Sequence, residues 1–344
     1  MFGIAKRKAL TWSVISSLLI GATACENAGT EIEGFEILGE TQGTTYQIII
    51  AEEECDVNKD QVDSVLHAFD LSLSTYIPES IISGLNLGMD TLHIQDKFFL
   101  DCMNESMEIF ELTAGAFDPS VAPIYNLWGF NSEEPKPPHE AVLNELKPSI
   151  GMNNAFYWSN DSIAKRSPQA LLNFNAIAQG QAVDVVADYL ADNGIKNYYV
   201  EIGGEIRVAG KNRSSENWVI GIDIPEDGSN ERQIENTVHL SNMSIATSGN
   251  YRNYYVKDGV KYAHTLDPSS LSPVQHDLLS VTVITPVCAR ADAFATAFMV
   301  MGEKKTLEFI KAYPELEIDV YMLSSAEGDS FRRSSSKGFD RYFE

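Results

Sequence analysis

The chain has 344 residues, of which 44% are hydrophobic and 22% are charged, with 23 Gly and 13 Pro; this is ordinary globular composition and excludes disordered, collagen-like and low-complexity proteins. Acidic residues outnumber basic ones 49 to 25, which gives a formal net charge of −24. A surface of this sign repels phosphate groups, so nucleic-acid binding is disfavoured, and a phosphorylated ligand needs a cation beside it.

The first 24 residues have the pattern of an export signal. Basic residues at 6–8 precede an apolar run at 9–21 that is too short to span a bilayer. Small residues then lead directly to Cys25, which resembles a bacterial lipoprotein signal whose cysteine is lipidated after cleavage. The alternative is an ordinary secretory signal with an incidental cysteine. Cleavage removes three positive charges and no negative ones, so the mature chain carries −27.

These features predict three parts of unequal size. We expect a signal peptide over 1–24, a tether over 25–33 and one folded domain over 34–344. A lipidated Cys25 would anchor the protein to a membrane, facing the periplasm or the cell exterior. No later stretch is long and apolar enough to span a bilayer.

In the first half of the mature chain, a strand pattern is followed by two helix patterns. The stretch 45–50 is apolar and β-branched, which predicts a strand. Apolar side chains at helical spacing predict helices over 62–73 and 99–110, and Gly115 ends the second. A Pro- and Glu-rich stretch at 131–140 predicts a surface loop.

The second half adds two further helices and several strands. The third helix pattern covers 183–190 and ends at Gly194, and the last helix is expected over 305–313. Strands are expected at 197–202, 206–209, 218–224, 281–284 and 317–323, with a turn at 203–204. No repeat or long linker interrupts these patterns, which together predict a mixed α+β fold.

Three cysteines remain after Cys25. Cys55, Cys102 and Cys288 are scattered, without a CxxC pair or the Cys/His spacing of a metal site. We expect Cys102 and Cys288 to be buried free thiols, although the sequence leaves one bridge open.

Asp292 and Thr296 lie in the segment ADAFATAF, directly after a predicted strand. On a helix their spacing places a carboxylate and a hydroxyl on one face, while Phe294 and Phe298 anchor another face in the core. Two such oxygen ligands are a plausible partial shell for Mg²⁺, which completes its octahedron with water and substrate phosphates. The alternative is an acidic residue near a helix N-terminus, where the helix dipole stabilises it.

Three further segments carry polar groups of interest. His264 is one of six histidines and has a reference pKa of ~6.5, which suits a general base; the alternative is a hydrogen-bonded structural histidine in a strand. The glycines at 203–204 let the backbone approach a ligand closely, or form a plain turn. The segment 113–119 reads as a helix end running into an Asp-Pro turn.

Eight segments follow one another along the mature chain. They are GTTY at 43–46, STYIPESIISGLN at 74–86, TAGAFDPSVAPIYNLWGF at 113–130, NFNAIAQGQAVD at 173–184, EIGGE at 201–205, IATSGNYRNYY at 245–255, HTLDP at 264–268 and SVTVI…ADAFATAFMVMG at 280–302. In this order they resemble the ApbE family of exported FAD:protein FMN transferases. GAFDPSVAP…WGF and ADAFATA are the most specific stretches, and the resemblance covers essentially the whole mature chain.

The resemblance implies a fold, a reaction and a site. The fold would be α+β, with β-sheets flanked by helices and two lobes around a flavin cleft. The reaction would move FMN from FAD to a Ser or Thr of an acceptor flavoprotein and release AMP. Mg²⁺ would be held by Asp292, Thr296 and the carbonyl of Ala178, with Ala295 as a further contact, and His264 would be the base. FAD contacts are implied for Gln42, Ala116, Phe117, Asp118, Asn175, Gln181, Thr265 and Asp267. The isoalloxazine ring also needs an aromatic or apolar slot, for which the candidates are Tyr76, Tyr251, Tyr254 and Trp128.

The sequence departs from the family pattern at three positions. Gln179 stands where a Lys is common, Asn173 where an Asp is common and Leu271 where a Gly is expected. Two other functions use the same pocket: a non-catalytic FAD-binding lipoprotein, and a Mg²⁺-dependent FAD pyrophosphatase in which water replaces the acceptor hydroxyl. The intact Asp292, Thr296 and His264 favour an enzyme over a carrier.

Overall fold

The computed structural model describes residues 34–88, 91–130, 135–225, 233–250, 254–257, 259–327 and 330–343. The predicted signal peptide, Cys25 and the tether lie outside the described residues. Within the described part, no helix has both the length and the apolar character needed to cross a membrane.

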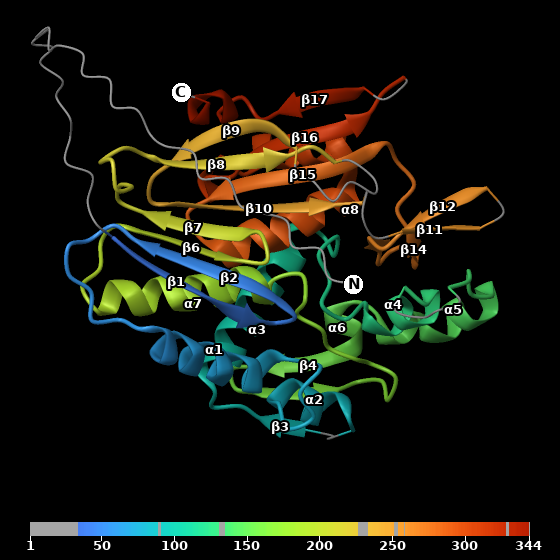
Figure 1. The fold of residues 1–344 in the computed structure, drawn as a ribbon. Helices are drawn as coiled ribbons and strands as arrows, with labels where there is room; N and C mark the ends of the chain where they lie inside the picture. The colour runs from blue at the N-terminus through green and yellow to red at the C-terminus, as the bar shows by residue number, and fades with distance from the viewer. Residues whose placement is uncertain are drawn as a thin grey trace, which may run out of the picture. The chain divides into compact units, whose positions relative to one another are not determined.

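A large antiparallel sheet organises the described chain (Figure 1). In the part that the structure describes, it has eight strands in the order β1-β2-β6-β7-β10-β15-β16-β17. Their bounds are Phe35–Thr41, Thr44–Ile50, Tyr198–Ile202, Glu205–Ala209, Met243–Gly249, Leu278–Thr285, Asp319–Ser325 and Phe331–Ser335. The structure therefore confirms the predicted strands at 45–50, 197–202, 206–209, 281–284 and 317–323. Most of their predicted ends lie within two residues of the observed ends. The pairing of β10 with both β7 and β15 joins segments far apart in the sequence.

The central strands of the sheet contribute to a core on each face, since successive strand residues point to opposite sides. On β15 and β16, Val283 and Val320 face one core, whereas Ile284 and Tyr321 face another. The first core is covered by α1 (Lys59–Leu73), α3 (Lys97–Leu112), α7 (Ala178–Asp192) and α8 (Cys288–Ala312). The second is covered by the hairpin of β8 (Trp218–Asp223) and β9 (Ile234–Leu240) and by the short helix η3 (Phe339–Tyr342). Cys102 and Cys288 are buried free thiols, as predicted, and Cys55 is a half-buried free thiol.

Smaller elements complete the fold. They are α2 (Ile81–Asn86), the sheet β3-β5-β4 (Thr91–His93, Ser162–Lys165, Phe156–Ser159), α4 (Ala122–Trp128), α5 (Glu140–Leu146), η1 (Lys147–Ser149), α6 (Met152–Ala155), β11 (Tyr254–Lys257), β12 (Val260–Ala263), β13 (Leu266–Asp267), β14 (Ser272–Pro273) and η2 (Pro314–Leu316). Residues 131–134 of the predicted loop lie outside the described residues, and its last residue begins α5.

The helices at 62–73, 99–110 and 183–190 are confirmed as α1, α3 and α7, and the last predicted helix, at 305–313, is also confirmed. It is the second half of α8, which begins at Cys288 and contains a break at Gly302, where φ is 76° and ψ is 167°. The hydroxyl of Thr306 donates to the Gly302 carbonyl at 2.9 Å and supports the chain across the break. ADAFATAF therefore lies in the helix before the break, and the segment at 305–312 lies in the helix after it.

A third core packs α4 and α5 against the β11–β14 region. Leu271 lies in it with φ of 57°, in the left-handed region that favours glycine. Its side chain is buried, and its carbonyl accepts a hydrogen bond of 2.9 Å from the indole N–H of Trp128. Leu271 thus keeps the backbone conformation of the glycine expected at this position. A left-handed conformation costs a non-glycine residue about 1–2 kcal/mol, which burial of the leucine side chain offsets. Trp128 serves this packing and does not line the cavity described below.

Asp184 of α7 fixes the start of α8. The N-cap residue Val287 has no side-chain hydrogen bond to the helix, so the first N–H groups need an outside acceptor. The Asp184 carboxylate accepts from the N–H of Cys288 at 3.1 Å and of Ala289 at 2.8 Å. It also pairs with Arg207 of β7 at 2.8 Å. One buried carboxylate thus ties α7, α8 and the sheet together.

Replacing Asp184 with Ala is expected to destabilise the protein by about 3–5 kcal/mol, because it leaves buried N–H groups without an acceptor and leaves the Arg207 guanidinium with only the exposed Asp188 as its ion-pair partner. Asp188 is the matched control: it pairs with the same Arg207, but its side chain is 67% exposed. Its replacement with Ala should cost only about 0–1 kcal/mol. Urea unfolding of both variants measures the difference. Equal losses would contradict the capping role.

Candidate functional site

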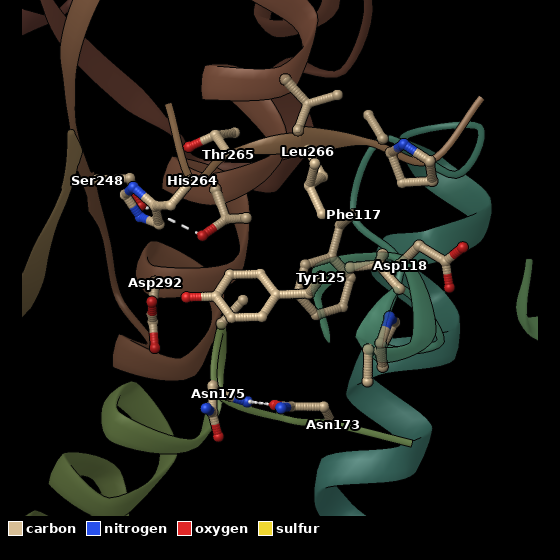
Figure 2. A pocket seen from close by; sticks show the side chains of 18 of the residues that line it. Phe117, Asp118, Tyr125, Asn173, Asn175, Ser248, His264, Thr265, Leu266 and Asp292 are labelled. Atoms are coloured by element: carbon tan, nitrogen blue, oxygen red, sulfur yellow. Dashed lines mark hydrogen bonds between the residues drawn. The ribbon is translucent and has the colours of Figure 1, made fainter. Parts of the chain in front are cut away.

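A cavity of about 500 Å³ opens beside the N-terminal half of α8 (Figure 2). It is bounded by the end of β10, the start of β7, the loop before α4 and the segments around 175 and 265. Its lining residues are Ala116, Phe117, Asp118, Pro119, Val121, Ala122, Tyr125, Asn173, Asn175, Ala176, Gln179, Glu205, Thr247, Ser248, Gly249, His264, Thr265, Leu266, Pro268, Asp292, Thr296 and Val300. We call this the large cavity. Eight of the residues that the sequence assigned to the site are among them.

A second, smaller hollow of about 170 Å³ adjoins it. Its lining residues are Gln42, Phe69, Asp70, Leu73, Ser74, Tyr76, Asn175, Ala178 and Gln179. Asn175 and Gln179 line both spaces. The two spaces therefore share a wall.

Asp292 and Thr296 lie in the wall of the large cavity, one helical turn apart on α8. Phe294 and Phe298 stack at 5.5 Å between ring centroids inside the helix-side core, which fixes the rotation of the helix. The Asp292 carboxylate is buried and accepts a hydrogen bond of 3.2 Å from the Gly180 N–H at the start of α7. Burial raises its pKa to about 7, although that hydrogen bond acts in the opposite direction. The hydroxyl of Thr296 lies 3.2 Å from that of Ser248.

Glu205 is a wall residue whose carboxylate the sequence analysis did not single out. It follows a two-residue turn in which Gly203 and Gly204 have φ of 65° and 111°, which joins β6 to β7. Burial, followed by the nearby Asp292, raises the pKa of Glu205 well above its usual range. The signal available in the sequence was the acidic residue at the start of a predicted strand, directly after the glycine pair.

His264 also lies in the wall, but not in a strand. It falls between the end of β12 and the start of β13. Figure 2 shows its ring on the side of the cavity that carries Ser248 and Asp292. The neighbouring Thr265 lines the cavity and donates from its hydroxyl to the Asn250 side chain at 2.5 Å.

The turn at 116–118 forms the opposite wall. Ala116, Phe117 and Asp118 all line the cavity. The Asp118 carboxylate accepts from the N–H and the hydroxyl of Ser120 at 2.9 and 2.6 Å and from the Gly151 N–H at 2.9 Å. Figure 2 shows this side chain directed away from His264 and Asp292. The carboxylate thus holds the turn in shape.

Tyr125 is a second wall residue that the sequence analysis missed. Its ring projects from α4 across the cavity, with the hydroxyl toward the side of Asp292 (Figure 2). Burial raises its pKa above the usual tyrosine value. The residue belongs to the segment 113–130, but a tyrosine in a helix gives no separate signal of its own.

Several predicted contacts lie elsewhere. Gln181 is buried in α7 and its amide N–H donates to the Phe98 carbonyl at 3.1 Å. Asp267 accepts from the N–H and hydroxyl of Ser269 at 2.8 and 2.7 Å, which closes a turn outside the cavity wall. Ala295 is fully buried in the core. None of these three residues lines either space, and their contacts with FAD or the metal stay predictions.

Other predicted residues line the small hollow and not the large cavity. Gln42, with φ of 51° in the β1–β2 turn, hydrogen bonds to the Asp70 carboxylate. Tyr76 is 80% exposed at the mouth, and Ala178 begins α7. Of the remaining ring-slot candidates, Tyr251 lies outside the described residues and Tyr254 packs under the Lys261 ammonium at 3.7 Å.

The two other departures from the family pattern are found at this wall. Asn173 accepts a hydrogen bond of 2.7 Å from the Asn175 N–H, drawn as a dashed line in Figure 2, so the amide keeps the acceptor that an Asp would offer. Gln179 lines both spaces with a neutral side chain where the family has a cation.

The charge of the large cavity favours a cation. Two buried carboxylates, Asp292 and Glu205, face it, and the described lining residues include no Lys or Arg. The oxygen donors of Asp292 and Thr296 are the kind that Mg²⁺ prefers. Among the described residues, no group of three or more His, Cys, Asp or Glu side chains is arranged to hold a metal ion. A cation here would therefore share its coordination with substrate phosphates and water.

Known proteins resemble the chain along its length. The sequence model of the ApbE family matches residues 42–322. A FAD:protein FMN transferase of Vibrio cholerae is 34% identical over 341 residues, covering 95% of this chain and 97% of the relative. The protein of that name from Haemophilus influenzae is 31% identical, covering 96% and 97%.

Solved structures agree. The flavin transferase ApbE from Vibrio cholerae has a TM-score of 0.79 at 33% identity, covering 90% of this chain and 99% of that one. The apo form of Pseudomonas stutzeri flavinyl transferase ApbE has a TM-score of 0.79 at 30% identity, covering 90% and 97%. The chain belongs to the ApbE family.

Proposed function

We propose that this protein is an enzyme that transfers FMN from FAD to a Ser or Thr hydroxyl of an acceptor flavoprotein and releases AMP, with Mg²⁺ as its metal. Membership of the ApbE family and the transferase names of its relatives support flavin transfer. The observation that carries the rest is the large cavity, where His264, Asp292 and Thr296 come together from two distant segments.

The residues of the cavity supply the chemistry of a phosphoryl-type transfer. The acceptor hydroxyl oxygen attacks the phosphorus on the FMN side of the pyrophosphate. The new P–O bond forms as the P–O bond to the AMP phosphate breaks, and AMP leaves with the electron pair. His264 takes the proton of the acceptor hydroxyl, because a Ser or Thr hydroxyl is a weak nucleophile until a base removes its proton.

The charge balance explains the metal. FAD brings a doubly negative pyrophosphate to a wall that already holds Asp292 and Glu205 and no Lys or Arg among its described residues. Asp292 and Thr296 would hold Mg²⁺, which when bound would neutralise the phosphates and assist AMP departure. Ala178, which lines the small hollow, remains the predicted carbonyl ligand.

Incubation with FAD, Mg²⁺ and a candidate acceptor protein tests the reaction. We expect AMP by chromatography and a flavin adduct on a Ser or Thr of the acceptor by mass spectrometry. AMP with free FMN and no adduct would indicate a FAD pyrophosphatase. FAD binding without AMP release would indicate a carrier.

We further propose that the enzyme is a lipoprotein held at a membrane through Cys25. Replacing Cys25 with Ser should abolish labelling by a palmitate analogue and leave an uncleaved precursor or a soluble exported form. A single acyl chain binds only marginally, so stable retention of the native protein implies several chains. An unlabelled, freely soluble native protein would leave a plain secretory signal instead. A chain lacking residues 1–25 is the control and should still turn over FAD, because every proposed site residue lies between 42 and 296.

A further inference from the structure

Glu205 presents an unsatisfied carboxylate oxygen to the large cavity. The side chain is 8% exposed, and its Oε2 atom has no hydrogen-bond partner. Buried polar side chains are normally hydrogen bonded, and an ionised one without a partner is costly. An unpartnered oxygen in the wall of a functional cavity therefore indicates a group that binds there.

The neighbours of Glu205 identify the charge of that group. Asp292 lines the same cavity and is buried as well. The described wall holds no Lys or Arg that could neutralise two acidic groups. Two carboxylates that share a buried site ionise together only when a cation lies beside them.

We propose that Glu205 is a positioning residue for the divalent cation and supplies the second negative charge of the site formed by Asp292 and Thr296. This inference rests on the proposed function, because it deepens the metal site of that reaction.

A purely structural role for Glu205 makes the opposite prediction for Glu205→Gln. If the side chain acted only as a neutral buried acid, replacing it with the amide would leave the affinity for the metal unchanged. If it is the second charge of a cation site, the amide should weaken binding of the cation. The increase in melting temperature that the metal causes should then be smaller in E205Q than in the wild type.

The experiment measures Mn²⁺ binding to the purified full-length protein without FAD, by the electron paramagnetic resonance signal of free Mn²⁺, together with thermal melts. We expect E205Q to bind Mn²⁺ about 10–100-fold more weakly. E205D keeps the charge and should recover most of the affinity. E201Q is the matched control, because Glu201 lies on the same hairpin, accepts from the Gly204 N–H at 2.8 Å and does not line the cavity. It should bind within about twofold of wild type.

Wild-type affinity of E205Q for Mn²⁺ would overturn the proposal. Equal losses of Mn²⁺ affinity in E205Q and E201Q would also overturn it, because they would show that any nearby negative charge has the same effect. Asp292→Asn separates this outcome from failure of the proposed function. If the wild type binds Mn²⁺ and D292N does not, the metal site stands whatever E205Q shows. If the wild type does not bind Mn²⁺, the metal in the proposed function falls together with the role of Glu205.

Discussion

Replacing Asp292 with Asn is expected to abolish AMP release nearly completely while the fold is retained. The change removes the charged member of the predicted metal set of Asp292, Thr296 and the Ala178 carbonyl. Asn keeps an oxygen that can accept from the Gly180 N–H, and Phe294 and Phe298 still anchor the helix in the core. Chromatographic measurement of AMP over a range of Mg²⁺ concentrations tests the prediction. Circular dichroism controls for the fold, and a wild-type rate at low Mg²⁺ would show that the metal assignment is wrong.

The same variant has a second consequence, for the stability of the metal-free protein. The pKa of Asp292 is about 7 in the folded state and about 3.9 in an unfolded chain. Between these values the folded state binds the extra proton, so its stability falls as the pH rises from about 4 to 7. D292N removes this titration, and urea unfolding at pH 5 and pH 7.5 should show a smaller pH dependence than in the wild type. Glu205 retains its own contribution of the same sign.

Replacing His264 with Ala is expected to reduce turnover by roughly 10²–10⁴-fold, the usual contribution of a general base. The metal ligands of α8 and the walls around 117 and 175 stay in place, so FAD affinity should change much less. Quenching of flavin fluorescence measures that affinity, and single-turnover AMP release measures the chemical step. Equal losses in binding and turnover would assign His264 to binding or to structure instead.

Much of the fold follows from local patterns in the sequence. The period of 3.6 in α1, α3 and α7 and the β-branched composition of β2 and β15 are properties of single elements, so short windows contain the whole signal. The helix face shared by Asp292 and Thr296 is of this kind, because the backbone alone sets their spacing. The strand at 35–41 was missed, whereas the separate helix after Gly302 was predicted and is present.

Some residues of the predicted site line the large cavity, and others from the same motifs do not. Family motifs led to His264, Asp292, Thr296 and the turn at 116–118, all of which line the large cavity. The same motifs included Gln181 and Asp267, whose side chains the structure directs into α7 packing and a local turn. A motif identifies the segment, but the rotation of a helix or the closure of a turn decides which side chain faces the ligand.

The sequence by itself determined the helices, most strands of the sheet, the acidic character that requires a cation beside any phosphate, and the family. Only the tertiary structure brought Glu205 to Asp292, because antiparallel pairing of β7 with β10 and β10 with β15 joins segments some ninety residues apart. Burial then made those two carboxylates interact, since both are removed from the water that would screen them. That interaction depends on distance and solvent exclusion, which no local pattern of residues encodes.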